Sequence, residues 1–244
     1  MGADGEIAVV TGGARGIGAG IVRRLAADGY RLAVLDLDLE LAERIAEEVG
    51  GVAHRCDVGD PDEVRRVAAQ VGPAEVLVNN AAIVGLMKTV MECTDEDLAA
   101  NVRVNLLGAV HCCRAFGRMM IERGGGSIVS ISSGAARSAS PGHGIYPATK
   151  AAIDTLTRQL ALEWGPLGVR VNAVAPGAIQ TERNAHRFQG EIWEQRVVRI
   201  PLRRTGFPAD IADVVAALCS HDMRYVTGQI IAVDGGMSAG SAGA

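Results

Sequence analysis

The chain has 244 residues, of which 48% are apolar, and its 24 basic and 28 acidic residues leave a net charge of −4. This composition is typical of a globular protein and argues against a nucleic-acid-binding surface. The first six residues lack the features of a signal peptide, and no run of about 18 apolar residues occurs, so we expect no membrane segment and a cytoplasmic location.

The cysteines and histidines give no sign of a disulfide framework or a metal site. The five cysteines are odd in number and form no C-x-x-C pair, which predicts reduced thiols. The five histidines are scattered, so we expect no bound metal.

The first apolar run, residues 7–10, leads into a glycine-rich turn. Four glycines fall within residues 12–18, and apolar residues then recur at helical spacing up to Gly29. Isolated glycines usually mark a loop, but a glycine turn between a strand and a helix favours a dinucleotide site, because the helix N-terminus offers free N–H groups to a pyrophosphate.

The second apolar run, residues 31–35, ends at Asp36, which lies 20 residues after Gly16. A carboxylate at this distance fits the acceptor for the hydroxyl groups of an adenosine ribose. A turn or a helix cap is the alternative.

Strands and helices continue to alternate along the next 50 residues. A helix ends at Gly50, a strand over 52–56 leads to Asp57 and Val58, and Asp60-Pro61 starts another helix. The strand over 76–78 ends at the adjacent amides Asn79 and Asn80. We expect equally that these amides bind a ligand or that they tie neighbouring strands together.

A capping pattern at Thr94 predicts one long helix through Asn105 to about Arg123. A strand over 127–132 follows, with Ser133 at its end. The remaining expected elements are a helix over 146–164, a strand over 169–175 ending at Pro176-Gly177, a helix from Pro208, a strand over 229–233 and a flexible tail over 238–244.

The alternation of strands and helices predicts one α/β domain over residues 1–244 with a parallel sheet. The carboxyl ends of parallel strands share one edge, where such folds bind ligands. The glycine turn, Asp36, Asp57, Asn79, Ser133 and Pro176-Gly177 all follow strand ends, so we expect them to gather there.

Tyr146 and Lys150 lie four residues apart, which places both side chains on one face of a helix. They are either a general acid/base pair or a surface pair. A neighbouring ammonium favours the phenolate and can bring the pKa of the tyrosine, ordinarily about 10, toward working pH. The chain contains only two lysines, Lys88 and Lys150, so the choice of lysine here over arginine favours the acid/base reading.

Across essentially its whole length the chain resembles the short-chain dehydrogenases/reductases. The resemblance rests on motifs in the family's order: Thr11-Gly12-x-x-x-Gly16-Ile17-Gly18, Asn79-Asn80-Ala81, Ser133 13 residues before Tyr146, Tyr146-x-x-x-Lys150, and Pro176-Gly177 with Thr181. It implies a single doubly wound Rossmann-type domain with a seven-stranded parallel sheet, a nicotinamide dinucleotide and, in most members, a homotetramer built on the two long helices.

The resemblance also implies roles for single residues. Tyr146 would be the acid/base, Ser133 the donor to the substrate oxygen, Lys150 the ligand of the nicotinamide ribose and Asn105 the holder of a water. Asp57 and Val58 would hold the adenine, Asn79 would lie near the adenosine, and Ile179 and Thr181 would touch the carboxamide. The full implied cofactor set is Gly12, Arg15, Gly16, Ile17, Gly18, Asp36, Asp57, Val58, Asn79, Ala81, Tyr146, Lys150, Pro176, Gly177, Ile179 and Thr181. Ala82 departs from the family's glycine, and a positive φ there would strain the turn.

These features predict hydride transfer between NAD(H) and a small secondary alcohol or ketone. Asp36 would repel the 2′-phosphate of NADP, while Arg15 could offset part of that penalty. The alternatives are an NADPH-dependent 3-oxoacyl-thioester reductase and an inactive dinucleotide sensor or scaffold. Residues 181–207 are expected to cover the site; their six arginines would clamp an anionic substrate or be solvated, and His143 would contact substrate or be a loop residue.

Overall fold

The computed structural model describes residues 5–84, 87–139 and 141–240. Seven strands form one sheet in the order β3-β2-β1-β4-β5-β6-β7, and every neighbouring pair is parallel. The strands are β1 (Ile7–Thr11), β2 (Arg31–Asp36), β3 (Val52–Arg55), β4 (Val76–Asn79), β5 (Gly126–Ile131), β6 (Val169–Pro176) and β7 (Ile230–Val233). The order reverses between β1 and β4, as in a doubly wound Rossmann fold, so the predicted fold class is confirmed.

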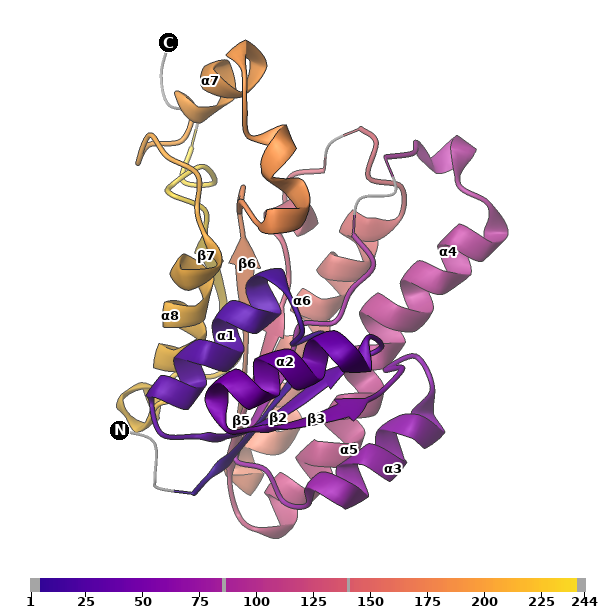
Figure 1. The fold of residues 1–244 in the computed structure, drawn as a ribbon, viewed down its shortest axis with the longest axis vertical. Helices are drawn as coiled ribbons and strands as arrows, with labels where there is room; N and C mark the ends of the chain where they lie inside the picture. The colour runs from indigo at the N-terminus through magenta and orange to yellow at the C-terminus, as the bar shows by residue number, and fades with distance from the viewer. Residues whose placement is uncertain (1–4, 85–86, 140, 241–244) are drawn as a thin grey trace.

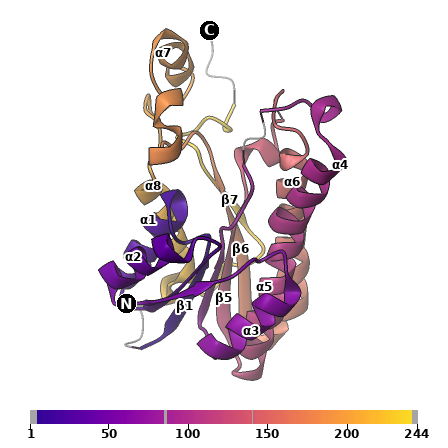
Figure 2. The same cartoon turned by 45° about the vertical axis from the view of Figure 1, so that its right-hand side comes forward.

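Helices cover both faces of this sheet (Figures 1 and 2). The α-helices are α1 (Gly16–Ala27), α2 (Leu39–Val49), α3 (Pro61–Val71), α4 (Asp95–Asn101), α5 (Gly108–Glu122), α6 (Tyr146–Trp164), α7 (Glu191–Val197) and α8 (Pro208–Cys219). Helices α1, α2 and α8 pack on one face, and α3, α5 and α6 pack on the other. Along β1, Ala8 and Val10 enter the first apolar layer while Val9 enters the second, which is the alternation expected of a central strand.

Local signals set several helix ends, and those at Gly50 and Asp60 were predicted from the sequence. The Asp38 side chain accepts a hydrogen bond from Leu41 N at the start of α2, and Gly50 ends that helix with a left-handed φ of 67°. The Asp60 side chain caps α3, and Pro61 occupies its first position. The strand ends differ from the predicted ones by one residue at most, as at β3, β5 and β7.

The long helix predicted from Thr94 to Arg123 is interrupted. A π-helical turn, η2 (Val102–Leu107), separates α4 from α5. Such a turn adds a residue to the helical path and changes the direction of the side chains that follow it, and it is common at functional sites. Asn105, which is 2% exposed, lies within this turn. The uniform apolar period of the sequence gave no sign of the interruption.

The segments between β6 and α8 rise above the carboxyl ends of the strands (Figure 1). They comprise the 3₁₀ segment η5 (Glu182–Arg187) and α7. At the end of the chain, Ser238 and Ala239 are hydrogen-bonded within a turn, while residues 241–244 of the predicted tail lie outside the described residues.

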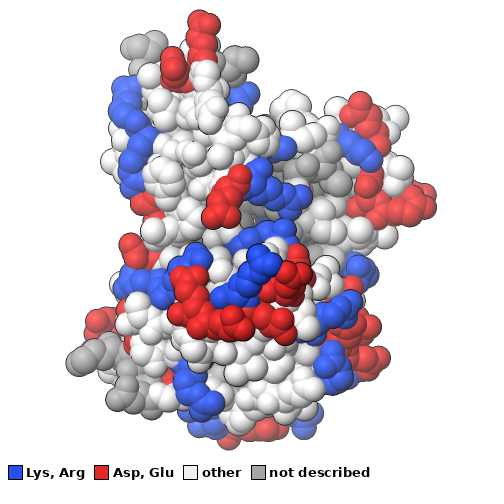
Figure 3. Space-filling view, viewed as in Figure 1, with Lys and Arg blue, Asp and Glu red and all other residues white. Residues whose placement is uncertain are grey.

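Charged side chains of both signs are mixed over the face shown in Figure 3, and acidic ones gather over α2, which carries Glu40, Glu43, Glu47 and Glu48. No helix in the described part of the chain has the length and apolar character needed to cross a bilayer. All five cysteines are free thiols, as their odd number predicted.

Candidate functional site

The glycine turn at residues 12–18 brings the end of β1 against the start of α1. Gly12 and Gly16 have φ values of 61° and 54°, in the left-handed region that glycine tolerates. A Cβ on Gly18 would lie 2.0 Å from the Gly12 carbonyl oxygen, so no side chain fits there. No side chain caps α1 at Arg15, which leaves its first N–H groups available to an anionic ligand. Ile17, two residues after Arg15, is partly buried and packs against the first apolar layer.

Asn80 ties this turn to the end of β4. Its Nδ2 donates to the carbonyl oxygens of Thr11 at 3.0 Å and Gly12 at 2.8 Å. The backbone N–H groups of Asn80 and Ala81 both donate to Thr11 Oγ1, at 3.0 and 3.1 Å. Asn80 therefore joins neighbouring strands, which was one of the two roles left open by the sequence.

Asn79 is buried below the edge and is 7% exposed. Its Nδ2 donates to Cys113 Sγ at 3.2 Å and to Ser130 Oγ at 3.3 Å, while its Oδ1 is buried without a hydrogen-bond partner. The side chain thus contacts β5 and α5 and keeps one acceptor unused.

Asp36 ends β2 beside the glycine turn. Its Oδ2 accepts from Ala14 N at 3.1 Å and its Oδ1 accepts from Asp38 N at 3.1 Å. Arg15 does not pair with Asp36, because its Nη2 lies 2.8 Å from Asp38 Oδ2. The only basic side chain predicted to moderate the charge of Asp36 is thus held by a second carboxylate.

Asp57 follows the end of β3, and both its oxygens are engaged. Oδ1 accepts from Gly59 N and Oδ2 accepts from Arg103 Nη1, each at 2.8 Å. Burial by itself would raise the pKa of Asp57. The hydrogen bonds from Arg103 and Gly59 N have the larger combined effect in the opposite direction, so the pKa lies below its usual value. The neighbouring Val58 is 6% exposed, and its carbonyl lies 3.0 Å from His111 Nδ1.

Tyr146, Ser133 and Lys150 meet where α6 begins beside the end of β5. The Ser133 hydroxyl lies near the phenol of Tyr146 and lowers its pKa, and Ser133 Oγ accepts a hydrogen bond from Ala135 N at 3.1 Å. Lys150 Nζ lies 5.8 Å from the centre of the Tyr146 ring and donates to the Ile131 carbonyl at 2.7 Å. Both Tyr146 and Lys150 are buried, at 8% and 3% exposed.

The pKa directions in this cluster correct one expectation. Burial raises the pKa of Tyr146, and the hydrogen bond with Ser133 only partly lowers it. The sequence predicted that Lys150 would lower the pKa of the phenol toward working pH, but burial of the phenol raises it instead. Burial also lowers the pKa of Lys150, to about 8.

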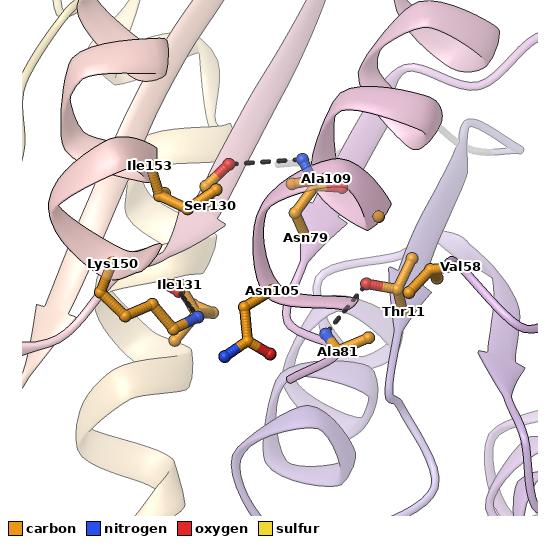
Figure 4. A pocket seen from close by; sticks show the side chains of 11 residues that line it. Thr11, Val58, Asn79, Ala81, Asn105, Ala109, Ser130, Ile131, Lys150 and Ile153 are labelled. Carbon is orange, nitrogen blue, oxygen red and sulfur yellow. Dashed lines mark hydrogen bonds between the residues drawn. The ribbon is translucent and has the colours of Figure 1, made fainter. Parts of the chain in front are cut away.

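Asn105 faces Lys150 across a small polar cavity of about 10 Å³ (Figure 4). The amide of Asn105 exchanges two hydrogen bonds with the backbone of Ile83, at 2.7 and 3.0 Å, and donates to Thr149 Oγ1 at 3.3 Å. A space of this size can hold one water if polar partners surround it. The lining residues are Thr11, Val58, Asn79, Ala81, Asn105, Gly108, Ala109, Ser130, Ile131, Lys150 and Ile153.

The segment after β6 closes the site from the opposite side. Gly177 packs so closely on Asp234 that a Cβ would lie 2.5 Å from Asp234 Cβ. Ile179 is 7% exposed. Thr181 lies against the glycine turn, since its Cγ2 is 3.4 Å from the position of a Cβ on Gly16. Of the predicted residues from Pro176 to Thr181, Thr181 therefore meets the glycine turn in space.

Comparisons with known proteins agree with this geometry. The model of the family described as enoyl-(acyl carrier protein) reductase matches residues 12–238. The chain is 37% identical to D-threitol dehydrogenase of Mycolicibacterium smegmatis, over 96% of this chain and 93% of that one. It is 40% identical to galactitol 2-dehydrogenase (L-tagatose-forming) of Cereibacter sphaeroides, over 96% and 95% of the two chains.

A third relative is a 3-oxoacyl-[acyl-carrier-protein] reductase, FabG of Staphylococcus aureus, which is 38% identical over 94% of this chain and 97% of its own. Among solved structures, that of gox2181 superposes with a TM-score of 0.92 at 32% identity, over 98% of this chain and 97% of the other.

The chain belongs to the short-chain dehydrogenase/reductase family. It is therefore an oxidoreductase that transfers a hydride between an NAD(P) cofactor and a secondary alcohol or its ketone. The residues at the sheet edge fit such a dinucleotide: the glycine turn leaves no room for side chains, the α1 N-terminus is uncapped, and Asp36 stands at the end of the next strand. Within the described residues, no group of three or more His, Cys, Asp or Glu side chains could hold a metal ion.

The one departure from the family pattern, Ala82, causes no strain. Among the described residues only Met87 and Arg203 combine a side chain with a positive φ, so Ala82 does not adopt the conformation that would require glycine. The doubt about the geometry of this turn is thereby removed.

Two open predictions concerned the substrate side of this dehydrogenase/reductase site. Arg204 forms an ion pair with Asp210 at 2.6 Å, and Arg203 donates to the Val198 carbonyl, whereas an arginine clamp on substrate stays a prediction. His143 forms an isolated bridge with Lys88, and its Nδ1 lies 3.2 Å from the Pro141 carbonyl, so it belongs to a structured loop.

Sequence reasoning missed several residues that the structure brings to the site. Asp38 could have been found from its N-cap position before α2, and Asp154 from its place four residues after Lys150. Arg103 carried no local signal, because its pairing with Asp57 spans 46 residues.

Proposed function

We propose that the protein is an NAD-dependent dehydrogenase of a small secondary alcohol, with Ser133, Tyr146, Lys150 and Asn105 as its catalytic set. The observation that carries this proposal is the buried cluster in which Ser133 acts on the Tyr146 phenol and the Lys150 ammonium lies 5.8 Å from the centre of the phenol ring. An inactive sensor or scaffold would not need a buried phenol, hydroxyl and ammonium together beyond the dinucleotide pocket. When bound, the nicotinamide accepts the hydride in oxidation and returns it in reduction.

The chain's own residues would manage the proton. In oxidation the Tyr146 phenolate takes the proton of the substrate hydroxyl, and in reduction the phenol returns it. The Ser133 hydroxyl donates to the substrate oxygen and stabilises it as its charge changes. The Lys150 ammonium favours the phenolate, and Asn105 shapes the polar cavity in which a water can connect to Lys150.

The preference for NAD is supported by the charges at the end of β2. A 2′-phosphate would meet Asp36 at short range, and Arg15 is already paired with Asp38. The residues that would hold the cofactor are the glycine turn, Asp36, Asp57, Val58, Asn79, Ala81, Tyr146, Lys150 and the run from Pro176 to Thr181.

A polyol-like substrate is supported by two relatives, because those proteins are named for D-threitol and galactitol. The second candidate, an NADPH-dependent reductase of 3-oxoacyl thioesters, is supported by the similarity to FabG. The Asp36 carboxylate, together with the pairing of Arg15 to Asp38, favours the first candidate, because both disfavour the 2′-phosphate of NADP.

Three further expectations belong to this proposal. We propose that residues 1–244 act as one domain. We also propose that residues 181–207 cover the substrate, because η5 and α7 rise over the site and the rings of Phe188 and Trp193 pack edge-on with their centres 4.6 Å apart. A homotetramer is supported by exposed Leu107 at the end of η2 and exposed Leu162 on α6, whereas Ile153 and Leu160 are buried in the protein's own core. The cytoplasmic location stays a prediction.

The test is turnover of the wild type and of Tyr146→Phe with NAD and NADP, on a panel of polyols and 3-oxoacyl thioesters. We expect a higher kcat/KM with NAD by about tenfold to a hundredfold, and a loss of more than about a hundredfold in kcat for Tyr146→Phe with cofactor binding retained. Equal efficiency with NADP and activity only on thioesters would replace the first candidate by the second. Retention of more than about a tenth of the activity by Tyr146→Phe would contradict the acid/base role.

A further inference from the structure

Asp154 is the third member of a row on α6 that begins with Tyr146 and Lys150. The three side chains follow one another at intervals of four residues, so they lie on one face of the helix. Asp154 is 6% exposed. A carboxylate is rarely buried this far unless a partner satisfies it.

The partner of Asp154 is Ser132, the residue immediately before Ser133. Ser132 Oγ lies 2.5 Å from Asp154 Oδ1 and 3.3 Å from the Lys150 carbonyl oxygen. Because Lys150 Nζ also donates to the Ile131 carbonyl at 2.7 Å, α6 is joined to the end of β5 at two points. These contacts hold the helix that carries Tyr146 in place against the strand that presents Ser133.

Asp154 is also the charged group that acts on Lys150. Burial lowers the pKa of Lys150 to about 8, and the Asp154 carboxylate opposes this effect. The other groups facing Lys150 are uncharged: the Tyr146 phenol on α6, the Ile131 carbonyl on β5 and the Asn105 amide on η2. Arg170, the charged residue of β6, bonds instead to the last carbonyls of α8.

We propose that Asp154 is a positioning residue of the site: its carboxylate holds Ser132, the neighbour of Ser133, against α6 and places a negative charge on the helix face that carries the buried Lys150. The proposal deepens the proposed function, on which its kinetic consequence rests. Without this negative charge, the ammonium that favours the Tyr146 phenolate would be lost at a lower pH. The charge state of Lys150 itself can be measured without any cofactor or substrate.

The chain is suited to that measurement because it has only two lysines. Protein carrying ¹³C at the lysine Cε positions gives two signals, which Lys88→Arg assigns. In Asp154→Asn, a substitution of nearly equal shape, we expect the titration midpoint of Lys150 to fall by roughly one pH unit. The midpoint of Lys88, which is paired with Asp97 at 2.6 Å, should not move and serves as the internal reference.

Ser132→Ala is the matched control, because it removes the hydrogen bond but keeps the charge. We expect it to lower the melting temperature while the Lys150 midpoint stays in place. If the midpoint of Lys150 is unchanged in folded Asp154→Asn, or if Ser132→Ala moves it as far, the charge role is wrong. Should Asp154→Asn not fold, the double variant Ser132→Ala with Asp154→Leu replaces the hydrogen-bonded pair by apolar groups. In that variant the titration midpoint of Lys150 must fall by the same amount.

Kinetics separate this inference from the proposed function. In Asp154→Asn the alkaline side of the pH profile for alcohol oxidation should move to lower pH by the same amount as the Lys150 midpoint, and in Ser132→Ala it should not. A shifted midpoint with an unshifted profile would overturn the kinetic part. Turnover that persists in Tyr146→Phe would overturn the proposed function while leaving the titration result intact.

Discussion

Arg15 pairs with Asp38, with Nη2 2.8 Å from Oδ2, and so it is withheld from the carboxylate of Asp36 two residues earlier. The two side chains are 51% and 41% exposed, and an ion pair this accessible contributes only about 0 to 1 kcal/mol. The pair can therefore adjust the choice of cofactor but cannot decide it alone.

Asp38→Asn should release Arg15 and improve the use of NADP. Asparagine caps a helix as well as aspartate does, so α2 should keep its start. We expect kcat/KM with NADP to rise about twofold to fivefold, measured beside the value with NAD. The double variant Arg15→Gln with Asp38→Asn should lose this gain, and an equal gain in both variants would show that Arg15 is not involved.

The rate of alcohol oxidation should increase with pH between about 6 and 8. Burial raises the pKa of Tyr146, and oxidation requires its deprotonated form, so more enzyme becomes competent as pH rises. Ketone reduction requires the phenol, which stays protonated throughout this range because its pKa is raised above the ordinary value of about 10, so the reduction rate should stay nearly constant. Initial rates in both directions on one substrate pair check this, and a flat profile in both directions would argue against Tyr146 as the acid/base.

Ala82→Gly should bring no gain in activity, although glycine is the family's residue at this position. The residue does not have a positive φ, so glycine would only add freedom to the unfolded chain. We expect a loss of about 0.4 to 1 kcal/mol in the free energy of unfolding, measured with urea. An increase in kcat/KM would mean that the turn is strained in the working enzyme.

Arg170→Ala should destabilise the fold without touching the site. The guanidinium donates to the carbonyl oxygens of Leu218 at 2.8 Å and of Cys219 and Ser220 at 3.3 Å, at the end of α8. Loss of this half-buried cap should cost about 2 to 4 kcal/mol. Thermal unfolding should show a melting temperature lower by about 5 to 10 °C.

The control for Arg170 is Arg118→Ala on α5, where the side chain is 81% exposed and pairs with Glu122. It should change stability by less than about 0.5 kcal/mol. Similar losses in both variants would show that the bonds of Arg170 to α8 add little.

Interactions between residues close in the sequence determined much of the fold. The glycine turn, the cap at Asp60, the helix end at Gly50 and the alternation of apolar runs each act over a few residues, so the sequence alone determined the order of the strands and the parallel sheet. Because parallel strands end at one edge of the sheet, the predicted topology also placed Asp36, Ser133 and the helix of Tyr146 at that edge.

Only the tertiary structure decided the questions that depend on distant neighbours. The role of Asn80 rests on contacts with Thr11 and Gly12, about 70 residues earlier, and the pKa of Tyr146 depends on how much protein excludes water around it. The π-helical turn at Asn105 and the burial of Asp154 against Ser132 follow from the packing of α5 and α6 on the sheet. Burial and long-range hydrogen bonds are properties of the assembled chain, and no local residue pattern encodes them.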